Sequence, residues 1–310
     1  MFVCYKLILR AKNKKYMDVI ITYVNGNDPV WQQDYERYTN VPILDKRFRD
    51  WGTLKFLMRG IETHMPFIEN VYLVVSHTSQ VPEWINTEQL KIVLHKDIIP
   101  NDILPVFNAN PIELHLHNIK GLSEEYIYFN DDIFPVLDCE PRDFFSDEKI
   151  IIRFTKHLFA SGMFKKITRN SDRLARKALG LKPSRVFMRP QHVCNPMFKS
   201  ECQEVYDLVK DEILNTSSTR IREAGNVNQY LFLDYMKLKG LNINKEISKK
   251  HFSLAIATER ALRKFLLNPT HKFVCINDVK LSEERYESLR KVLLETFEMI
   301  FPHKSRFEKQ

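Results

Sequence analysis

The hydrophobic residues in the first half of the chain alternate between strand-like and helix-like spacing. Residues 18–24 (DVIITYV) form a β-branched run that predicts a buried strand, and the polar residues 25–29 (NGNDP) predict a loop after it. Apolar residues between 54 and 61 recur every three or four positions, which predicts an amphipathic helix. Residues 71–75 (VYLVV) and 91–94 (KIVL) predict two further strands.

A short helix and one more strand follow. Asn110 and Pro111 favour a helix start, and we expect that helix to run to about Lys120, where Gly121 ends it. Residues 126–129 (YIYF) predict a strand with polar residues at its end. Strands alternating with helices predict an α/β fold with a Rossmann-like, mainly parallel sheet in the N-terminal half. Ligands bind such sheets at the carboxyl ends of the strands.

The second half of the chain is predicted to be mostly helical and to complete the ligand site. Helical spacing occurs near 202–214, 226–239, 258–267 and 282–300. The basic stretch 165–182 has two interpretations, a loop or a helical insert over the site.

We expect a single domain over residues 17–310 after a basic tail at 1–16, because no repeat or Gly-rich linker divides the chain. Within it, residues 17–150 form the α/β part and residues 151–310 the mainly helical part.

Composition supports a globular protein and restricts its partners. Hydrophobic residues make up 44% of the 310 residues, which is enough for a substantial core. The formal net charge of +8 suits phosphorylated substrates, acidic polymers or an anionic membrane surface. The sequence contains no motif of a nucleic-acid-binding fold, so we expect no nucleic-acid partner.

Cysteine use and the first residues indicate a cytoplasmic location. The 5 Cys are odd in number and include no Cys-x-x-Cys, so we expect neither a disulfide framework nor a cysteine-rich zinc site. The apolar start is broken by Lys6 and lacks a cleavage site, and no apolar run approaches the ~20 residues of a membrane span. The basic tail could contact the inner face of the membrane, with a solvated chain end as the alternative.

Asn130-Asp131-Asp132 carries the strongest chemical signal. Two adjacent carboxylates after a buried strand are costly unless a cation faces them. Mg²⁺ or Mn²⁺ bridging a diphosphate would supply that cation, because these ions prefer oxygen ligands. A solvated turn or a helix cap is the alternative.

Three other candidates are weaker when each is considered alone. Glu113 and His117 lie four residues apart on the predicted helix, so they share a face and could position a base or bind hydroxyls. His192 lies in an irregular stretch, where an imidazole can act as acid or base. Arg222 precedes a predicted helix start near Asn226 and could bind phosphate oxygens. For each, a position without a chemical role is the alternative.

Four segments, in order along the chain, resemble the Stealth family of sugar-phosphate transferases. That family includes bacterial capsular polysaccharide phosphotransferases and the animal lysosomal-enzyme GlcNAc-1-phosphotransferase. The segments are 18–29 (DVIITYVNGNDP), 47–145 (with RFRD at 47–50, VPEW at 81–84 and YFNDD at 128–132), 189 to about 235, and 275–308 (with CIND at 275–278). The third segment departs from the family, with HVCNP at 192–196 for His-x-Pro-x-Pro, and Asn226 where many members have Asp.

The resemblance implies a glycosyltransferase-A-like fold and a transfer reaction. A sugar-1-phosphate would move from a nucleotide sugar such as UDP-HexNAc to a carbohydrate hydroxyl, forming a phosphodiester in capsular or exopolysaccharide biosynthesis. Two alternatives stay open: an ordinary glycosyltransferase that releases a nucleoside diphosphate, and a non-catalytic carbohydrate-binding protein.

The resemblance also implies roles for individual residues. His192 would be the general base, Arg222 would neutralise phosphate oxygens, and Glu113 would orient His192 or the acceptor. The residues implied are Glu113, Asp132, His192 and Arg222 as catalytic groups, Asp131 and Asp132 as ligands of Mg²⁺ or Mn²⁺, and Asn25, Asp28, Arg49, Asn130 and His117 as substrate-binding groups.

Overall fold

A five-stranded sheet forms the centre of the protein in the computed structural model, which describes residues 17–43 and 48–310. Its strand order is β10-β4-β1-β2-β3, and four of the strands are parallel. The strands are β1 (Met17–Thr22), β2 (Ile68–Val75), β3 (Lys91–Leu94), β4 (Glu125–Asn130) and the antiparallel edge strand β10 (Asn195–Phe198). The predicted α/β fold with a mainly parallel sheet is confirmed.

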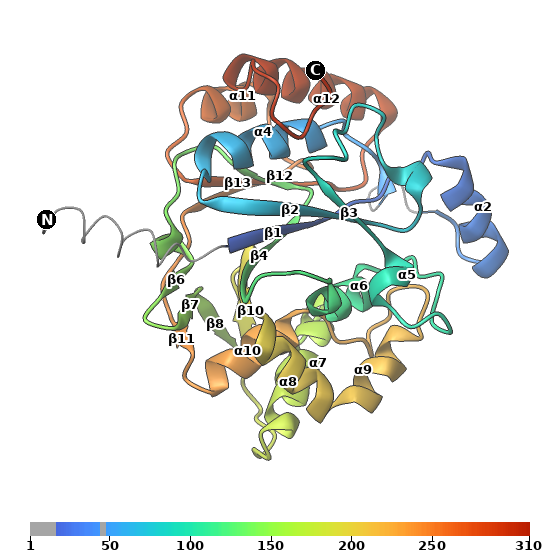
Figure 1. The fold of residues 1–310 in the computed structure, drawn as a ribbon, viewed down its shortest axis with the longest axis vertical. Coiled ribbons are helices and arrows are strands. Elements are labelled where there is room, and N and C mark those ends of the chain that lie inside the picture. Colours follow the sequence, from blue (N-terminus) through green and yellow to red (C-terminus); the bar gives the residue numbers. More distant parts are fainter. Residues whose placement is uncertain (1–16, 44–47) are drawn as a thin grey trace, which may run out of the picture.

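Helices cover both faces of this sheet. In Figure 1, α4 (Leu54–His64), α11 (Glu259–Leu267) and α12 (Glu283–Ile300) lie above it. Below it lie α6 (Ala109–His115), α7 (Gly162–Ala178), α8 (Lys199–Leu208), α9 (Lys210–Ser217) and α10 (Tyr230–Leu238), while α2 (Pro29–Tyr38) and α5 (His95–Ile98) lie to one side. The basic stretch 165–182 therefore forms most of a helix and not a loop.

Several helix boundaries differ from the sequence predictions. The helix expected from Asn110 is α6, which Asn108 caps by accepting the Asn110 N–H at 3.1 Å, and which ends at His115 before a 3₁₀ turn at Leu116–Asn118. The helix expected at 202–214 is divided into α8 and α9, because Val209 takes a non-helical φ of −132°. The helix expected from about 226 begins at Tyr230.

The second half also contributes short strands that the helical prediction omitted. One small sheet joins β12 (Lys249–Ser253), β13 (Phe273–Asn277) and β5 (Ile133–Pro135). Another joins β11 (Asn242–Ile243), β7 (Lys149–Ile151) and β6 (Phe145–Ser146), and β8 (Phe154–His157) pairs with β9 (Phe187–Pro190). Through β13 and β5, the last third of the chain is hydrogen-bonded to the segment that follows β4.

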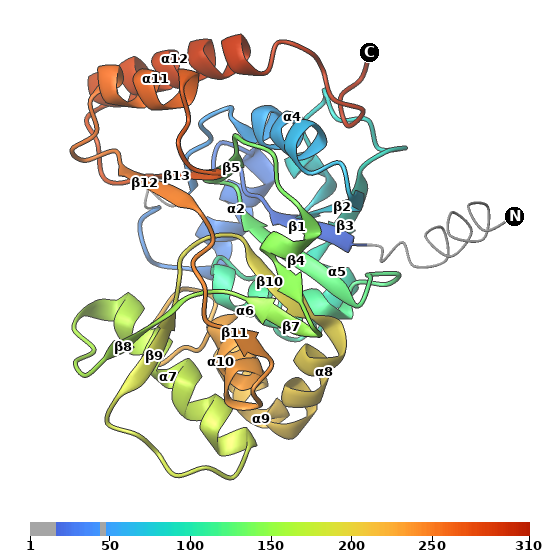
Figure 2. The same cartoon turned by 90° about the vertical axis from the view of Figure 1, so that its left-hand side faces the viewer.

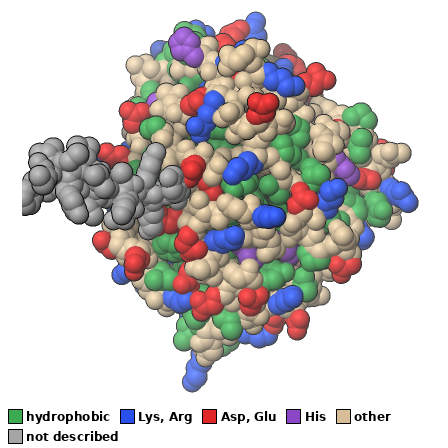
Figure 3. Space-filling model, in the orientation of Figure 1, with side chains coloured by type: hydrophobic (Ala, Val, Ile, Leu, Met, Phe, Trp, Pro, Cys, Tyr) green, Lys and Arg blue, Asp and Glu red, His purple; other side chains and the backbone are tan. Residues whose placement is uncertain are grey.

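One large hydrophobic core joins the two halves. It contains the central strand β1, whose Val19, Ile20 and Ile21 are fully buried, and it extends to Phe307 near the C-terminal end. Cys139, Cys194, Cys202 and Cys275 are buried free thiols. On the face drawn in Figure 3, acidic and basic side chains are interspersed. Among the described residues, no helix has the length and apolar character needed to cross a membrane.

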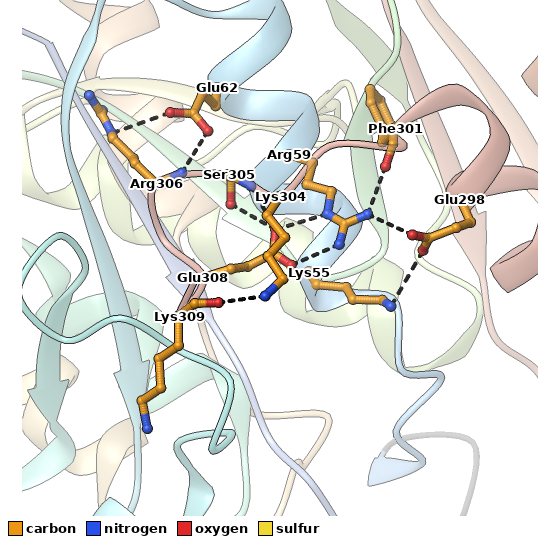
Figure 4. Close-up of polar contacts among 10 residues, drawn as sticks. All are labelled: Lys55, Arg59, Glu62, Glu298, Phe301, Lys304, Ser305, Arg306, Glu308 and Lys309. Atoms are coloured by element: carbon orange, nitrogen blue, oxygen red, sulfur yellow. Dashed lines mark hydrogen bonds and ion pairs between the residues drawn. The ribbon is translucent and has the colours of Figure 1, made fainter.

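The C-terminal segment is held against α4 by a buried ion pair (Figure 4). The Arg59 guanidinium donates from Nε and Nη2 to the two Glu308 carboxylate oxygens, both at 2.8 Å, and from Nη1 to the Phe301 carbonyl at 2.7 Å. The Arg59 and Glu308 side chains are only 6% and 5% exposed. A short antiparallel bridge between Ile85 and Glu308 completes the attachment.

Candidate functional site

A cavity of about 540 Å³ lies at the carboxyl ends of β1 and β4, where a parallel sheet is expected to bind ligands. Both halves of the chain line it, from Thr22 in β1 to Leu293 in α12. Seven of the residues predicted for the site line this cavity: Arg49, Glu113, Asn130, Asp131, Asp132, His192 and Arg222.

The antiparallel pairing of β10 explains how His192 reaches the acidic residues. Asn195 in β10 pairs with Tyr128 in β4, so the chain before Asn195 runs beside the chain that follows β4. His192 therefore comes close to Asp132, although the two are far apart in sequence. One ligand atom from each of Asp132, His192 and Cys275 lies within 4.8 Å of the others.

Acidic side chains crowd at the end of β4. Burial, together with the carboxylates of Asp132, Asp50 and Asp278, raises the pKa of Asp131 to about 7. Among the described residues, none hydrogen-bonds the buried Asp132 Oδ1, whereas Oδ2 accepts the Cys275 thiol at 3.6 Å. A divalent cation would relieve this crowding and satisfy the free oxygen. The carboxylate oxygens suit Mg²⁺ or Mn²⁺, and the nearby imidazole and thiol favour Mn²⁺ of the two.

The surroundings of His192 favour the neutral form of its imidazole. Burial lowers its pKa, while the Asp132 carboxylate opposes that effect. The Lys249 ammonium donates a hydrogen bond to the backbone carbonyl of His192, which fixes the backbone there. A neutral imidazole beside an acidic cluster can accept a proton from a substrate hydroxyl.

Glu113 and Arg222 both line the cavity, and their charges interact. Burial raises the pKa of Glu113, and the positive charge of Arg222 and the Gln229 N–H, which Glu113 accepts at 3.4 Å, oppose that rise. The Tyr128 hydroxyl also hydrogen-bonds Glu113 and lies 2.9 Å from Thr22 Oγ1. Glu113 therefore belongs to a buried polar network that includes the end of β1.

Hydrogen bonds join the loop that carries Arg222 to the start of α6. The Phe107 N–H donates to the Arg220 carbonyl at 2.8 Å, and Asn108 Nδ2 donates to Asn226 Oδ1 at 3.0 Å. The same Asn226 oxygen accepts the Glu223 N–H at 2.9 Å. These bonds close a turn just before the expected helix start near Asn226, so Arg222 lies in a loop as expected, while α10 begins only at Tyr230. Arg222 Nε is buried and has no hydrogen-bond partner in the part of the chain that the structure describes, which suits an anionic ligand.

Other cavity residues were not among the predicted site residues. Asp50 and Asp278 stand in the motifs RFRD and CIND, so their positions could have been noted from the resemblance. Arg189 and His251 also line the cavity, and the Arg189 guanidinium lies 5.3 Å from the Phe164 ring centroid. Arg189 begins the third segment of the resemblance, whereas nothing in the local sequence marks His251.

The predicted substrate-binding residues Asn25, Asp28 and Arg49 have different surroundings. Asn25 borders a smaller cavity beside Trp84, and its N–H donates to Gln80 Oε1 at 2.6 Å. Asp28 is buried and caps α2 by accepting the Trp31 N–H at 2.7 Å. Arg49 lines the main cavity, with its guanidinium 4.1 Å from the Tyr286 ring centroid.

His117 lies away from the cavity. It is fully buried, with the rings of Tyr206 and Phe232 at centroid distances of 4.9 and 5.6 Å. The expectation that Glu113 and His117 share a helix face is wrong, because α6 ends at His115 and the next residues form a 3₁₀ turn. The turn directs His117 into the core, while Glu113 remains at the cavity.

Comparison with known proteins gives consistent matches. The family models for Stealth protein conserved regions 2 and 4 match residues 47–152 and 264–310. The capsular polysaccharide phosphotransferase WcwK of Streptococcus pneumoniae is 31% identical, over 94% of this chain and 99% of its own length. The exopolysaccharide phosphotransferase cps2G of Lactiplantibacillus plantarum is 30% identical, over 94% of this chain and 96% of its own.

A solved structure of the galactosyltransferase LgtC, in complex with donor and acceptor sugar analogs, also aligns with this chain. It covers 89% of this chain and 95% of its own, with a TM-score of 0.39 and 10% identity.

Proposed function

The chain belongs to the Stealth family, and from this premise we propose that it is a phosphotransferase acting in capsular or exopolysaccharide biosynthesis. It moves a sugar-1-phosphate from a nucleotide sugar to a carbohydrate hydroxyl. The named phosphotransferases with which it aligns over nearly its whole length support this reaction class. The observation that carries the proposal is the single cavity in which Glu113, Asp132, His192 and Arg222 meet.

The reaction breaks one P–O bond and forms another. The acceptor hydroxyl attacks the phosphorus that carries the sugar, and a nucleoside monophosphate leaves with the electrons of the broken bond. The proton of the acceptor hydroxyl passes to a general base of the protein. Such transfers depend mostly on positioning and on stabilising negative charge, and the cavity offers cationic groups and a base close together.

We assign His192 as the base on the acceptor hydroxyl, because its imidazole borders the cavity beside the acidic cluster. Arg222, with Arg189, would bind non-bridging phosphate oxygens through charge-assisted hydrogen bonds. Glu113 would orient Arg222, because the Arg222 charge acts on its carboxylate, which also accepts hydrogen bonds from Tyr128 and Gln229.

Asp131 and Asp132 would hold the divalent cation, Mg²⁺ or Mn²⁺. When bound, the cation would neutralise charge on the donor diphosphate. The crowded carboxyl groups and the unpaired Asp132 oxygen support this assignment. A nucleotide-sugar donor, a glycan acceptor and a cytoplasmic location are parts of the same proposal.

The released nucleotide tests the proposal directly. The purified chain is incubated with Mg²⁺ or Mn²⁺, a glycan acceptor and a panel of UDP-, CMP- and GDP-sugars, and the nucleotide is identified by mass spectrometry. For a UDP- or GDP-sugar donor, release of the nucleoside monophosphate is expected. Release of the nucleoside diphosphate would instead assign an ordinary glycosyltransferase, and glycan binding without turnover would assign a binding protein.

A further inference from the structure

Large apolar side chains are exposed where β8 connects to α7. Phe159 is 77% exposed and Leu158 is 53% exposed, and Met163 on the first turn of α7 is exposed as well. Single exposed apolar residues are common on soluble proteins, but an adjacent Leu-Phe pair at the end of a loop is an unfavourable surface in water. The pair would gain free energy by entering an apolar environment.

The same part of the chain contains the protein's excess positive charge. Residues 153–190 contain eleven Lys and Arg and one acidic residue, Asp172, a net charge of +10. Since the whole chain has a net charge of +8, the rest of it carries −2. Asp172 pairs with Arg176, and Arg153 and Lys177 pair with Glu246 and Glu212, so the charges of these three basic residues are partly offset.

The basic and apolar groups belong to one continuous piece of structure. Along α7, Ile167, Leu174 and Ala175 are buried, whereas Lys166 and Arg173 on the opposite face are exposed. Figure 2 shows β8, β9 and α7 together on the side of the molecule opposite to β2 and β3. Phe164, Ile167 and Arg189 from the same elements line the main cavity, so this surface borders the cavity's edge.

We propose that residues 156–166 and the exposed basic face of α7, here called the β8–α7 surface, bind the anionic headgroups of a phospholipid bilayer. Leu158 and Phe159 enter the interface while Lys156, Lys166 and Arg173 contact the headgroups. Basic side chains beside an exposed apolar pair are the combination that interfacial membrane binding requires. A soluble polyanion would be bound by the charges alone and would leave the Leu-Phe pair in water, so the bilayer is the better match.

Vesicle flotation with the full chain tests this proposal. Wild type is expected to bind vesicles of phosphatidylcholine mixed with phosphatidylglycerol and to bind pure phosphatidylcholine much more weakly. The Leu158→Ser/Phe159→Ser variant is expected to lose about tenfold or more in binding, because two apolar side chains no longer enter the interface. Lys166→Glu with Arg173→Glu is expected to lose more than about tenfold at low salt, since each charge contributes about fivefold.

Ile256→Ser is the matched control, because Ile256 is 84% exposed in a loop outside residues 153–190. It should bind vesicles like wild type, and thermal melting should show all variants folded. Unchanged vesicle binding by the Leu158→Ser/Phe159→Ser variant would overturn the proposal. So would wild-type binding to a soluble polyanion such as dextran sulfate without binding to the mixed vesicles.

Discussion

The acidic side chains around the end of β4 change one another's ionisation. Asp131 keeps its proton up to about neutral pH because burial and the charges of Asp132, Asp50 and Asp278 all oppose its ionisation. Four carboxyl groups in one cavity are stable only when protons or cations reduce their charge. The protonation of these carboxyl groups therefore depends on whether a cation is bound between them.

His192 is the residue whose replacement tests the proposed mechanism most directly. His192→Ala is expected to lower kcat by about 10²- to 10⁴-fold, the usual contribution of a general base. KM for the donor should change little, because the donor phosphates are assigned to the arginines. His303→Ala, at an exposed position, is the control and should retain wild-type turnover. Near-normal kcat in His192→Ala would remove His192 from the mechanism.

Asp234 offers a prediction about stability that is separate from the cavity. It is buried in α10, neither carboxylate oxygen has a hydrogen-bond partner among the described residues, and burial, with Asp172 nearby, raises its pKa well above its ordinary value. A raised pKa means that the folded state binds the proton more tightly than the unfolded chain does. The stability that this group contributes is present below about pH 4, the unfolded value, and is lost as the pH rises.

Asp234→Asn is therefore expected to raise the free energy of unfolding by about 1–3 kcal/mol at neutral pH and to have little effect near pH 4. Urea unfolding at both pH values measures the difference. Asp172→Asn is the contrasting variant, because Asp172 accepts hydrogen bonds from Arg176 and from the Met188 N–H, and it should destabilise. Equal effects of Asp234→Asn at both pH values would contradict this account.

At the scale of elements, a buried ion pair between Arg59 and Glu308 attaches the C-terminal segment to α4, beside the more exposed contacts of Glu62 with Arg306 (Figure 4). Glu308→Ala leaves the Arg59 guanidinium buried with part of its hydrogen bonding lost, and it is expected to lower the free energy of unfolding by about 3–5 kcal/mol. Glu246→Ala removes a half-exposed pair with Arg153 and should cost less than about 1 kcal/mol. Chemical unfolding of both variants measures the contrast, and similar losses would contradict the assignment.

The same ion pair makes stability depend on pH. Burial alone would raise the pKa of Glu308, but hydrogen bonds from Arg59 and Ser305 outweigh burial and lower it. A lowered pKa contributes stability above the unfolded value of about 4.3, and this contribution is lost as the pH falls through the folded value. The unfolding midpoint of wild type should therefore fall more steeply in acid than that of Glu308→Ala.

An element could be predicted where its own residues determine it, and not where it depends on pairing with distant residues. The strands β1, β2, β3 and β4 were predicted because each is a short apolar run ended by turn residues, and α11 and α12 because their spacing is helical. Strand β10 was not predicted, since NPMF at 195–198 is short and contains Pro196. Its pairing with β4, distant in sequence, is what brings His192 to the acidic residues.

The site could be predicted only in part for the same reason. Asp131 and Asp132 follow directly from a strand end, whereas Arg189 and His251 reach the cavity through tertiary packing that no local pattern records. His117 was predicted for the site but does not line the cavity. Its spacing from Glu113 predicted a common helix face, but α6 ends at His115, before His117.

At the scale of the whole molecule, the cavity is lined by both halves of a continuous core. A ligand bound there should stabilise the entire chain and leave a single cooperative transition, in agreement with the predicted single domain. A nucleotide sugar with Mg²⁺ or Mn²⁺ at 100 times its Kd is expected to add about 2.7 kcal/mol to the free energy of unfolding.

Differential scanning calorimetry with and without a chelator measures this effect. Asp132→Asn should lose the metal-dependent shift, and Asp211→Asn, an exposed position on α9, should keep it. Two separate transitions, or a metal-dependent shift that survives in Asp132→Asn, would contradict the assignment.

The hydrogen bonds of Glu308 and its neighbours determine where the protein can be tagged or shortened. The Lys309 N–H donates to the Trp84 carbonyl at 2.8 Å, and the next residue, Gln310, is exposed. An affinity tag joined after Gln310 would project into solvent without disturbing these bonds, whereas trimming back only three residues would remove Glu308 and leave the Arg59 guanidinium buried without its carboxylate.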